Sequence, residues 1–485
     1  MNRRHFLISA ATAVSGCHSL PVASRMGEAA LEVPGEWAAT HQGRAGLDSD
    51  WLKRLGDSRL EEYAAAALKG NPDLKIAAAR VEQSRSLVRA TAARGLPQVD
   101  LTGRSSKSKR NFVGFPFGAG AGSGTGGGGA GAAPAVLSNE AENYETGVQF
   151  QWELDVWGRI RAGTAAAASL AQAAELELKA ARASLVAQVA RAWFGLTESR
   201  EQAMLAKEAL KAYEDTAAAL EERFRSGQSG EQGGLGAQLR LARSDVASAR
   251  AALEQREEAE GSAARALEVL AGRYPGGSAR TGGSLPELRS SPPAGLPSAL
   301  LLRRPDVLAA ERKFAAQGMR RKEARRAVFP RISLTGNKGY SSDSLGNLLN
   351  SDFGVWSLGG SVVESIFTGG QVVAEIRKRN AEEQEAMAAL QKTVLKAFSE
   401  VEDALAAEDK LQRREAFIVE ASRLAMEADT EARANFRQGT GDLLTVLATQ
   451  NRTVTARSQV SSIRRLRLEN RIALHLALGG DFTVR

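Results

Sequence analysis

The sequence predicts a mixed α and β protein formed by an internal duplication, in which short strands lead into very long helices. The segment Arg223-Phe224-Arg225-Ser226-Gly227 returns 212 positions later as Asn435-Phe436-Arg437-Gln438-Gly439. Upstream, Pro72-Asp73 matches Pro305-Asp306 at an offset of 233, so the first copy carries 21 extra residues between these two points. Matching segments in the same order along the chain indicate a repeated structural unit.

A second observation is the alternation of apolar and polar residues in the first copy. Within 146–155 the large apolar residues share one strand face and polar residues the other; the apolar ones are Val148, Phe150, Trp152 and Leu154. That face fits either the core of a soluble sandwich or the lipid around a transmembrane barrel whose polar face lines water. Residues 99–157 and 329–367 hold 12 of the 26 aromatic residues, which favours the aromatic girdles of a barrel.

A third observation is the length of the helical segments. Residues 371–438 contain no Gly or Pro over 68 positions, and such a helix would extend about 100 Å at about 1.5 Å per residue. The first copy has a matching segment interrupted only by single glycines. Each long helix ends in a glycine-containing turn and continues into a partner helix, so the long-helix regions are 160–272 and 371–478. Helices of this length pair as coiled coils.

The other elements fall into two repeats, 58–285 and 286–485. The first repeat opens with short helices near 59–68 and 72–93 and continues into strands within 98–157. The second repeat has the corresponding helix over 305–327 and strands over 331–367.

The N-terminus predicts an exported, lipid-anchored protein. Arg3-Arg4, a short apolar run and small residues form a signal peptide over 1–16, too short to span a membrane. Ser15-Gly16-Cys17 resembles a bacterial lipobox, in which the cysteine is acylated, for instance with palmitate; an ordinary signal peptide with an incidental cysteine is the alternative. Residues 17–57 have no sustained period and predict an extended lead. The arginine pair also resembles a twin-arginine signal, although a barrel must be exported unfolded, which favours the general secretory route.

Composition excludes several classes of function. Cys17 is the only cysteine, so a disulfide framework and a cysteine-based metal site are excluded. The four histidines, His5, His18, His41 and His475, form no metal-ligand spacing, and no nucleophile–base pair or phosphate loop is present. We therefore expect no enzyme activity, no cofactor and no metal. The net charge of +8 is small for a chain of 485 residues. The basic clusters of the chain lie in helical patterns and contain no nucleic-acid-binding motif, so no nucleic-acid partner is expected.

The strand count predicts an oligomer. Each repeat supplies about two strands, and a four-stranded sheet cannot close in lipid, where open edges are not tolerated. Two copies would give eight strands and a filled interior, whereas three would give twelve and leave room for water. Between the first two strands, Gly118–Gly131 has nine glycines in 14 residues and predicts a flexible loop at the outer tip.

Several motifs resemble those of the outer-membrane efflux protein family, the TolC-like channels, and specifically the lipoprotein branch (NodT-type) that serves RND tripartite pumps. They are spread in family order over nearly the whole mature chain: Trp152-Glu153-Leu154-Asp155-Val156-Trp157-Gly158-Arg159-Ile160-Arg161, Leu301-Leu302-Arg303-Arg304-Pro305-Asp306, Phe329-Pro330-Arg331-Ile332-Ser333-Leu334-Thr335 and Ile366-Phe367-Thr368-Gly369-Gly370. The resemblance implies a homotrimer in the outer membrane, with a 12-stranded β-barrel, four strands from each chain, continued by a long α-helical periplasmic barrel.

The resemblance also implies partners and sites. The partners would be a periplasmic adaptor (membrane fusion protein), an inner-membrane transporter of the RND type and outer-membrane lipid. The adaptor-facing tip would comprise Arg225, Gly227, Arg437 and Gly439. The gate would lie just beyond, at Asp442, Leu444, Thr445 and Ala448. Thr445 and Ala448 occupy positions where relatives often carry aspartates, so this chain lacks that acidic ring. The implied function is a passive exit duct for small molecules such as drugs; a coiled-coil structural or adhesion lipoprotein is the alternative.

Overall fold

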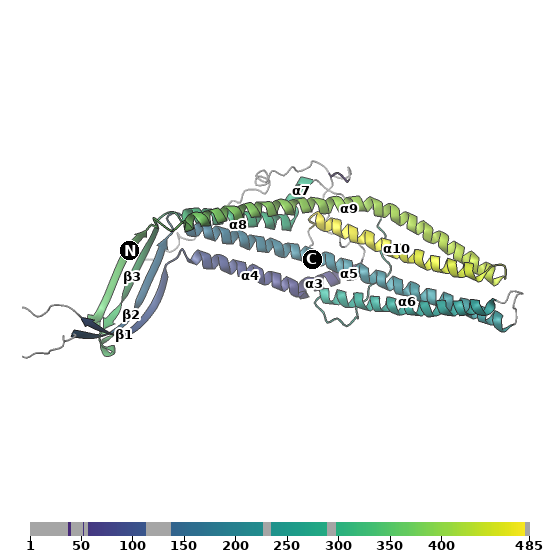
Figure 1. The fold of residues 1–485 in the computed structure, drawn as a ribbon, viewed down its shortest axis with the longest axis horizontal. Coiled ribbons are helices and arrows are strands. Elements are labelled where there is room, and N and C mark those ends of the chain that lie inside the picture. The colour runs from purple at the N-terminus through teal and green to yellow at the C-terminus, as the bar shows by residue number, and fades with distance from the viewer. Residues whose placement is uncertain are drawn as a thin grey trace, which may run out of the picture. The chain divides into compact units, whose positions relative to one another are not determined.

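The computed structural model describes residues 37–39, 52, 57–112, 137–226, 234–288 and 297–480 (Figure 1). The predicted signal peptide, Cys17, the glycine tract and Gly227 lie outside these residues. The chain divides into two compact units. Unit 1 comprises Met1–Ser84, Ser169–Ala315 and Gln384–Arg485, and unit 2 comprises Arg85–Ala168 and Ala316–Glu383. Each unit therefore contains segments of both sequence repeats.

The short helices begin where the local sequence provides caps. In α3 (Ser58–Gly70), the carboxylate of Asp57 accepts a hydrogen bond from the Arg59 N–H at 3.0 Å. In α4 (Pro72–Ala93), the Asn71 side chain accepts from the Asp73 N–H at 2.8 Å, and Pro72 occupies the first helical position, where its missing N–H costs nothing. The second repeat supplies α7 (Pro297–Arg303), which the sequence did not predict, and α8 (Pro305–Arg326).

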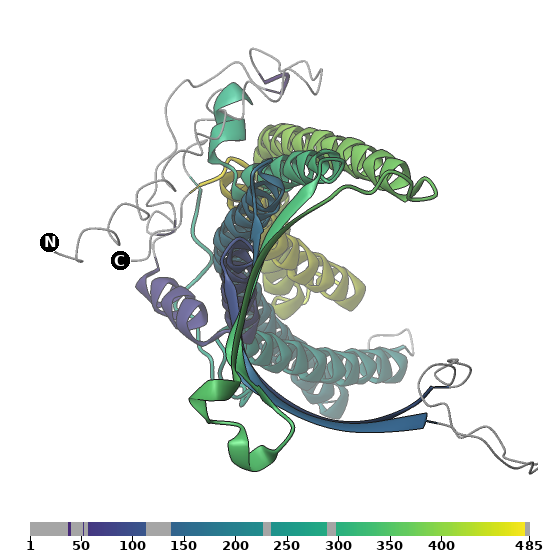
Figure 2. The ribbon, with the colours of Figure 1, turned by 90° about the vertical axis from the view of Figure 1, so that its left-hand side faces the viewer.

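Unit 2 contains one antiparallel sheet of four strands, which confirms the strand number predicted for one chain. The strands are β1 (Gln98–Phe112), β2 (Leu137–Leu154), β3 (Arg331–Ser342) and β4 (Gly354–Val363), and they lie in chain order. Figure 2 shows that the sheet is curved. Because β2 belongs to the first repeat and β3 to the second, their pairing joins the two copies.

The register places apolar side chains of all four strands on one face of this sheet. Residues directly opposite each other in an antiparallel pair share a face, and successive residues alternate between faces. Val148 pairs with Leu101 on one side and with Lys338 on the other, so Lys338 lies among the apolar residues of this face. The apolar members of this face, which we call the apolar face, are Val99, Leu101, Val148, Phe150, Trp152, Leu154, Ile332, Leu334, Trp356, Leu358 and Val362.

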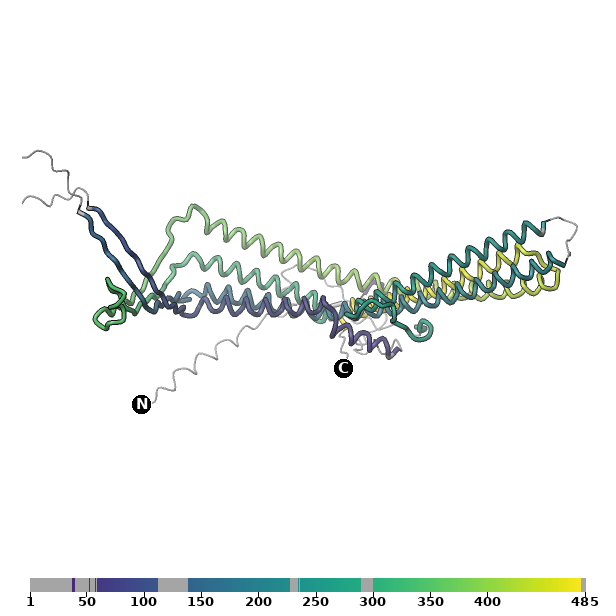
Figure 3. Tube along the Cα trace, turned by 90° about the horizontal axis from the view of Figure 1, so that it is seen from below, coloured from purple at the N-terminus to yellow at the C-terminus, as the bar shows by residue number. Residues whose placement is uncertain are grey.

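Two helices of equal length follow the strands of the two repeats. Helices α5 (Arg159–Arg225) and α9 (Gln371–Arg437) each have 67 residues, about 100 Å at about 1.5 Å per residue. Gly163 and Gly195 lie inside α5 without breaking it. The partner helices are α6 (Leu235–Leu270) and α10 (Leu443–Ala477), and Figure 3 shows α10 alongside the distal part of α9.

Away from the helical tip, the described residues of unit 1 form two apolar cores. One is formed by α3, α5, α6 and α10 around Trp193, Phe194 and Leu267, whose exposed fractions are 1% or less. The other is formed by α7, α8, α9 and α10 around Leu390, Val394 and Leu474. Trp37, in the segment predicted as an extended lead, packs into the second core, where its ring lies 6.1 Å from that of Phe398.

Candidate functional site

The turn between α9 and α10 in unit 1 forms the distal tip of the second repeat. Gly439 has a φ of +82°, a conformation that favours glycine. The N–H groups of Thr440 and Gly441 both donate to the Asn435 carbonyl, at 3.0 and 3.1 Å. A Cβ at Gly441 would lie 3.0 Å from the backbone nitrogen of Phe436, so the turn leaves little room for a side chain there.

Asp442 caps α10. Its carboxylate accepts from the Thr445 N–H at 2.9 Å and from the Thr445 hydroxyl at 2.7 Å. These hydrogen bonds hold the pKa of the Asp442 carboxyl below its usual value. Two of the four predicted gate residues, Asp442 and Thr445, therefore contact each other as a helix cap.

The other two predicted gate residues, Leu444 and Ala448, lie on an exposed face of α10. Leu444 is 62% exposed, whereas its neighbours Leu443 and Val446 are 2% and 1% exposed. Ala448 is also exposed, one helical turn further on. One face of the helix therefore packs inside the protomer and the other remains available for contact beyond it.

The buried face of the tip joins the two repeats. Leu443 and Val446 pack with Leu220 of α5, and this tip core also contains Leu239, Ala242, Ala432 and Phe436. Arg223 of α5 lies over the Phe436 ring, with its guanidinium carbon 4.2 Å from the ring centroid, and also donates to the Phe436 carbonyl. The sequence comparison paired Phe436 with Phe224, but it could not indicate that Phe436 contacts the neighbouring Arg223.

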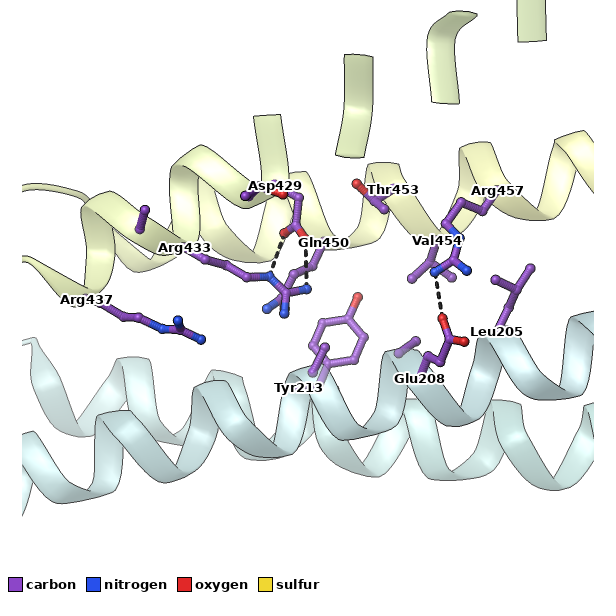
Figure 4. Close-up of a pocket in the computed structure, with 14 residues that line it drawn as sticks. Leu205, Glu208, Tyr213, Asp429, Arg433, Arg437, Gln450, Thr453, Val454 and Arg457 are labelled. Atoms are coloured by element: carbon purple, nitrogen blue, oxygen red, sulfur yellow. Dashed lines mark hydrogen bonds and ion pairs between the residues drawn. The ribbon is translucent and has the colours of Figure 1, made fainter. Parts of the chain in front are cut away.

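A cavity of about 480 Å³ lies next to the tip core, between α5, α9 and α10 (Figure 4). Tyr213 projects into it between two ion pairs, Asp429–Arg433 and Glu208–Arg457. Burial raises the pKa of the Tyr213 hydroxyl. Sequence reasoning identified none of these residues, because the helical pattern gives only their spacing along each helix.

Further along unit 1, polar side chains join α10 to α5 and α9. The Ser458 hydroxyl donates to the Gln202 side chain at 2.8 Å, and Gln202 donates to the Ser458 carbonyl at 3.0 Å. Between α9 and α10, the Glu408 carboxylate lies 2.6 Å from the Arg471 guanidinium and 3.6 Å from that of Arg467, and all three side chains are buried.

The structure also locates the other predicted site residues. At the tip, Arg225 pairs with Glu221 at 2.7 Å, and Arg437 lines the cavity. In unit 2, Trp152 donates to the Gly95 carbonyl at 2.9 Å. The apolar residues predicted for β2 all lie on the apolar face, with apolar residues of the neighbouring strands.

The described parts of the chain contain no group of three or more His, Cys, Asp or Glu side chains that could hold a metal ion. Among the described helices, none has a stretch sufficiently long and apolar to cross a membrane.

Comparisons with known proteins identify the family. Residues 64–273 and 296–480 match the outer membrane efflux protein family, with one match in each repeat. Outer membrane protein OprJ of Pseudomonas aeruginosa is 30% identical, over 93% of this chain and 90% of OprJ. The probable outer membrane lipoprotein SilC of Salmonella typhimurium is 26% identical, over 90% of this chain and 88% of SilC. The solved structure of the outer-membrane channel OprN superposes with a TM-score of 0.79 at 27% identity, covering 93% of this chain and 97% of OprN. This chain therefore belongs to the outer membrane efflux protein family.

Proposed function

We propose that this protein is the outer-membrane channel of a tripartite efflux system, a passive exit duct for small molecules such as drugs. The observation that carries this proposal, beyond family membership, is the apolar face of the sheet. Leu101, Trp356 and Leu358 on that face are 82%, 79% and 72% exposed. Apolar surface of this extent is typical of a contact with lipid or another protein.

The height of the apolar face suits an outer membrane. On β2 the face runs from Leu154 to Tyr144, beyond which Lys107–Glu142 and Lys109–Glu140 ion pairs occupy the same face. At about 3.3 Å per residue this stretch is roughly 33 Å long, and a strand tilt of about 45° gives it a height of roughly 24 Å. Outer-membrane barrels have apolar bands of about 25 Å.

The open edges of the sheet support an oligomer, and membership of the family supports a trimer. β1 and β4 each have one unpaired side within the chain, and unpaired strand edges are costly in lipid. We propose that three copies close a 12-stranded barrel with Val148, Phe150, Trp152 and Leu154 facing lipid. The long helices of the three copies would then form the periplasmic tunnel.

The helical tips are the proposed docking surface for a periplasmic adaptor, which would connect the channel to an inner-membrane transporter of the RND type. Arg225 and Arg437 remain exposed at the two tips. Exposed arginines favour a partner whose surface offers carboxylates or backbone carbonyls. Gly227 and Gly439 are proposed to shape the two turns.

The proposed gate lies at Leu444, where three copies of α10 would meet. A threefold apolar ring can close a pore by excluding water. Leu444→Ala should therefore raise the conductance in planar bilayers and make cells sensitive to large antibiotics such as vancomycin. Leu241→Ala is a matched control, because Leu241 is also exposed but lies on α6.

Two further variants separate an apolar gate from a polar one. Ala448→Asp should add cation selectivity without opening the channel, because it places a carboxylate in the proposed lumen beside Leu444. Asp442→Asn should have a small effect, since Asp442 is proposed to act as the cap of α10. An unchanged conductance in Leu444→Ala, together with an open channel in Asp442→Asn, would place the constriction at the polar residues.

We also propose that Cys17 carries a lipid anchor, and the similarity to SilC, a probable outer membrane lipoprotein, supports this proposal. Cys17→Ser should abolish incorporation of labelled palmitate but leave part of the trimer assembled, because the strands span the membrane. A wild-type protein that takes up no labelled fatty acid would exclude the lipobox.

A further inference from the structure

In unit 2, the turn from β2 into α5 brings two guanidinium groups together at Gly158. Gly158 has a φ of +76°. A Cβ placed there would lie 2.9 Å from Arg326 Nη1 and 3.3 Å from Arg161 Nη2, so both side chains converge on this point. Arg326, from α8, donates to the Gly158 carbonyl at 2.7 Å, which fixes its position.

The nearby carboxylate of Asp155 is shared between two backbone N–H groups and the Arg161 guanidinium. Asp155 accepts from the backbone N–H groups of Ile160 and Arg161, at 2.9 and 2.8 Å, and lies 3.3 Å from Arg161 Nε. The next carboxylate along β2, Glu153, is paired with Arg159. Arg161 also donates through Nη2 to the Asp155 backbone carbonyl at 3.2 Å. Its side chain is nevertheless 75% exposed and Arg326 is half-buried, so the two like charges remain accessible to an anion from outside.

Aromatic residues lie directly beside the two arginines. Trp157 precedes Gly158, and its ring stacks on that of Phe329 with centroids 5.1 Å apart. The Trp157 indole N–H donates to the Pro330 carbonyl at 2.9 Å. Trp157 and Phe329 are nevertheless 44% and 49% exposed. Half-exposed rings of this kind are typical of the boundary between lipid and water.

These groups lie at one end of the apolar face. Leu154, the last residue of β2, is opposite Ile332 near the start of β3. Trp157 and Phe329 are each three residues beyond that pair, and Val156 and Val328 beside them are 53% and 50% exposed. If the strands span the outer membrane, the long helices continue from this end, which is therefore the periplasmic end of the barrel.

We propose that Arg161 and Arg326 bind the phosphate of an anionic phospholipid in the periplasmic leaflet, with the Trp157–Phe329 pair against its upper acyl chains. This proposal rests on the proposed function, in which the strands span the outer membrane. Guanidinium groups bind phosphate oxygens through paired, charge-assisted hydrogen bonds. Their position next to an apolar surface favours a lipid phosphate over a free one, because only the lipid also covers the aromatic pair.

The test compares lipid retention by the full-length trimer extracted from membranes. Native mass spectrometry after addition of phosphatidylglycerol or phosphatidylethanolamine should show preferential retention of phosphatidylglycerol by the wild type. Arg161→Gln with Arg326→Gln should reduce that retention by about tenfold, the change expected on loss of charge-assisted hydrogen bonds. Arg161→Lys with Arg326→Lys keeps both charges and should recover part of the retention.

Two controls keep the result interpretable. Arg240→Gln with Arg256→Gln removes the same charge from exposed positions of α6 and should leave retention unchanged. Inorganic phosphate at matched concentration should not displace phosphatidylglycerol; displacement would identify a free-anion site and overturn the lipid assignment. Equal retention of the two lipids by the wild type, or equal loss in the α6 control, would also overturn it.

Planar-bilayer conductance, measured on the same preparations, tests the proposed function separately. A wild type that fails to conduct contradicts the channel. A conducting wild type without a preference for phosphatidylglycerol contradicts only the lipid site. The double glutamine variant should conduct like the wild type, which would also establish that it folds and inserts.

Discussion

The sheet of unit 2 and the helices of unit 1 place the same kinds of residue in opposite environments. In the sheet, Leu101 and Trp356 are 82% and 79% exposed. In the helices, Leu390, Val394 and Leu468 are fully buried. A helix in water gains stability by burying its apolar side chains, whereas a strand that faces lipid gains it by exposing them. The difference indicates that one chain is built for two solvents.

The polar residues differ in the same way. In unit 2 the strands are joined by backbone hydrogen bonds, and the face opposite the apolar one carries Gln149, Gln151 and Asn337. In unit 1 buried charges cross the helix interfaces, as in the contact of Glu408 with Arg467 and Arg471. The register of a strand is set by its alternating side chains and its turns. Two helices can slide past each other unless specific side chains prevent it.

The largest predicted effect concerns the buried charges between α9 and α10. Glu408→Leu should destabilise the protein by about 3–5 kcal/mol, because it removes the carboxylate that accepts from the buried Arg471 guanidinium, whereas Arg467 keeps its pair with Glu415. Glu427→Leu is the matched control on the same helix, since the Arg423–Glu427 pair is exposed and screened by water, so its loss should have a much smaller effect. Denaturant unfolding of the purified protein measures both. Equal losses in the two variants would mean that the buried cluster has no special role.

The next largest effect is expected from a charge on the apolar face of β2. Phe150→Arg should impair insertion by about 2–4 kcal/mol if the residue lies near the middle of the bilayer. Gln151→Arg, one position on and facing the opposite side, should be tolerated. The yield of heat-modifiable protein from outer membranes measures the outcome. A more severe defect in Gln151→Arg would reverse the assignment of the two faces.

The smallest predicted effect is a dependence of stability on pH through a buried carboxylate of unit 1. Glu268, at the end of α6, is 2% exposed. Burial raises the pKa of this carboxyl, but hydrogen bonds from the Ser278 hydroxyl and from the N–H groups of Gly277, Ser278 and Ala279 outweigh it and lower the pKa below 4.5. A lowered pKa in the folded state means that the carboxylate stabilises the fold above its ordinary pKa and loses this contribution as pH falls through the folded one.

Glu268→Gln should therefore cost about 1–3 kcal/mol at neutral pH, from the weakened hydrogen bonds. The difference in stability between wild type and variant should shrink as the pH falls below about 4.5. Unfolding followed by circular dichroism across this range measures the difference. A gap that stays constant from neutral to acid pH would show that the ionised carboxylate contributes nothing.

The elements could be predicted from the sequence because their causes are local. The 68-residue stretch without Gly or Pro indicated α9, and strict alternation within 146–155 indicated β2. The alternation also indicated that the large apolar residues of β2 share one face, as the register with β1 and β3 has them. Helix α7 was missed, because seven residues show too little periodicity for a helix to be recognised.

The contacts between elements could not be predicted in this way. The pairing of Glu408 with Arg471 joins residues 63 positions apart, and the period of each helix gives no information on how two helices align. The convergence of Arg161 and Arg326 on Gly158 likewise depends on the turn between β2 and α5. The gate residues stay a prediction from family position: the structure places Leu444 on an exposed face, and the Leu444 variant tests whether that face closes the pore.

The ladder between β2 and β3 has a consequence for biogenesis. Because β2 comes from the first repeat and β3 from the second, the sheet cannot be completed until most of the chain has emerged from the export machinery. Both compact units draw on both repeats, so the N-terminal half has no finished unit to fold into on its own. Its apolar strand would wait exposed in the periplasm, where such segments aggregate. The pairing of the two repeats therefore makes the sheet of unit 2 a late product of export, formed only after β3 and β4 have followed β2.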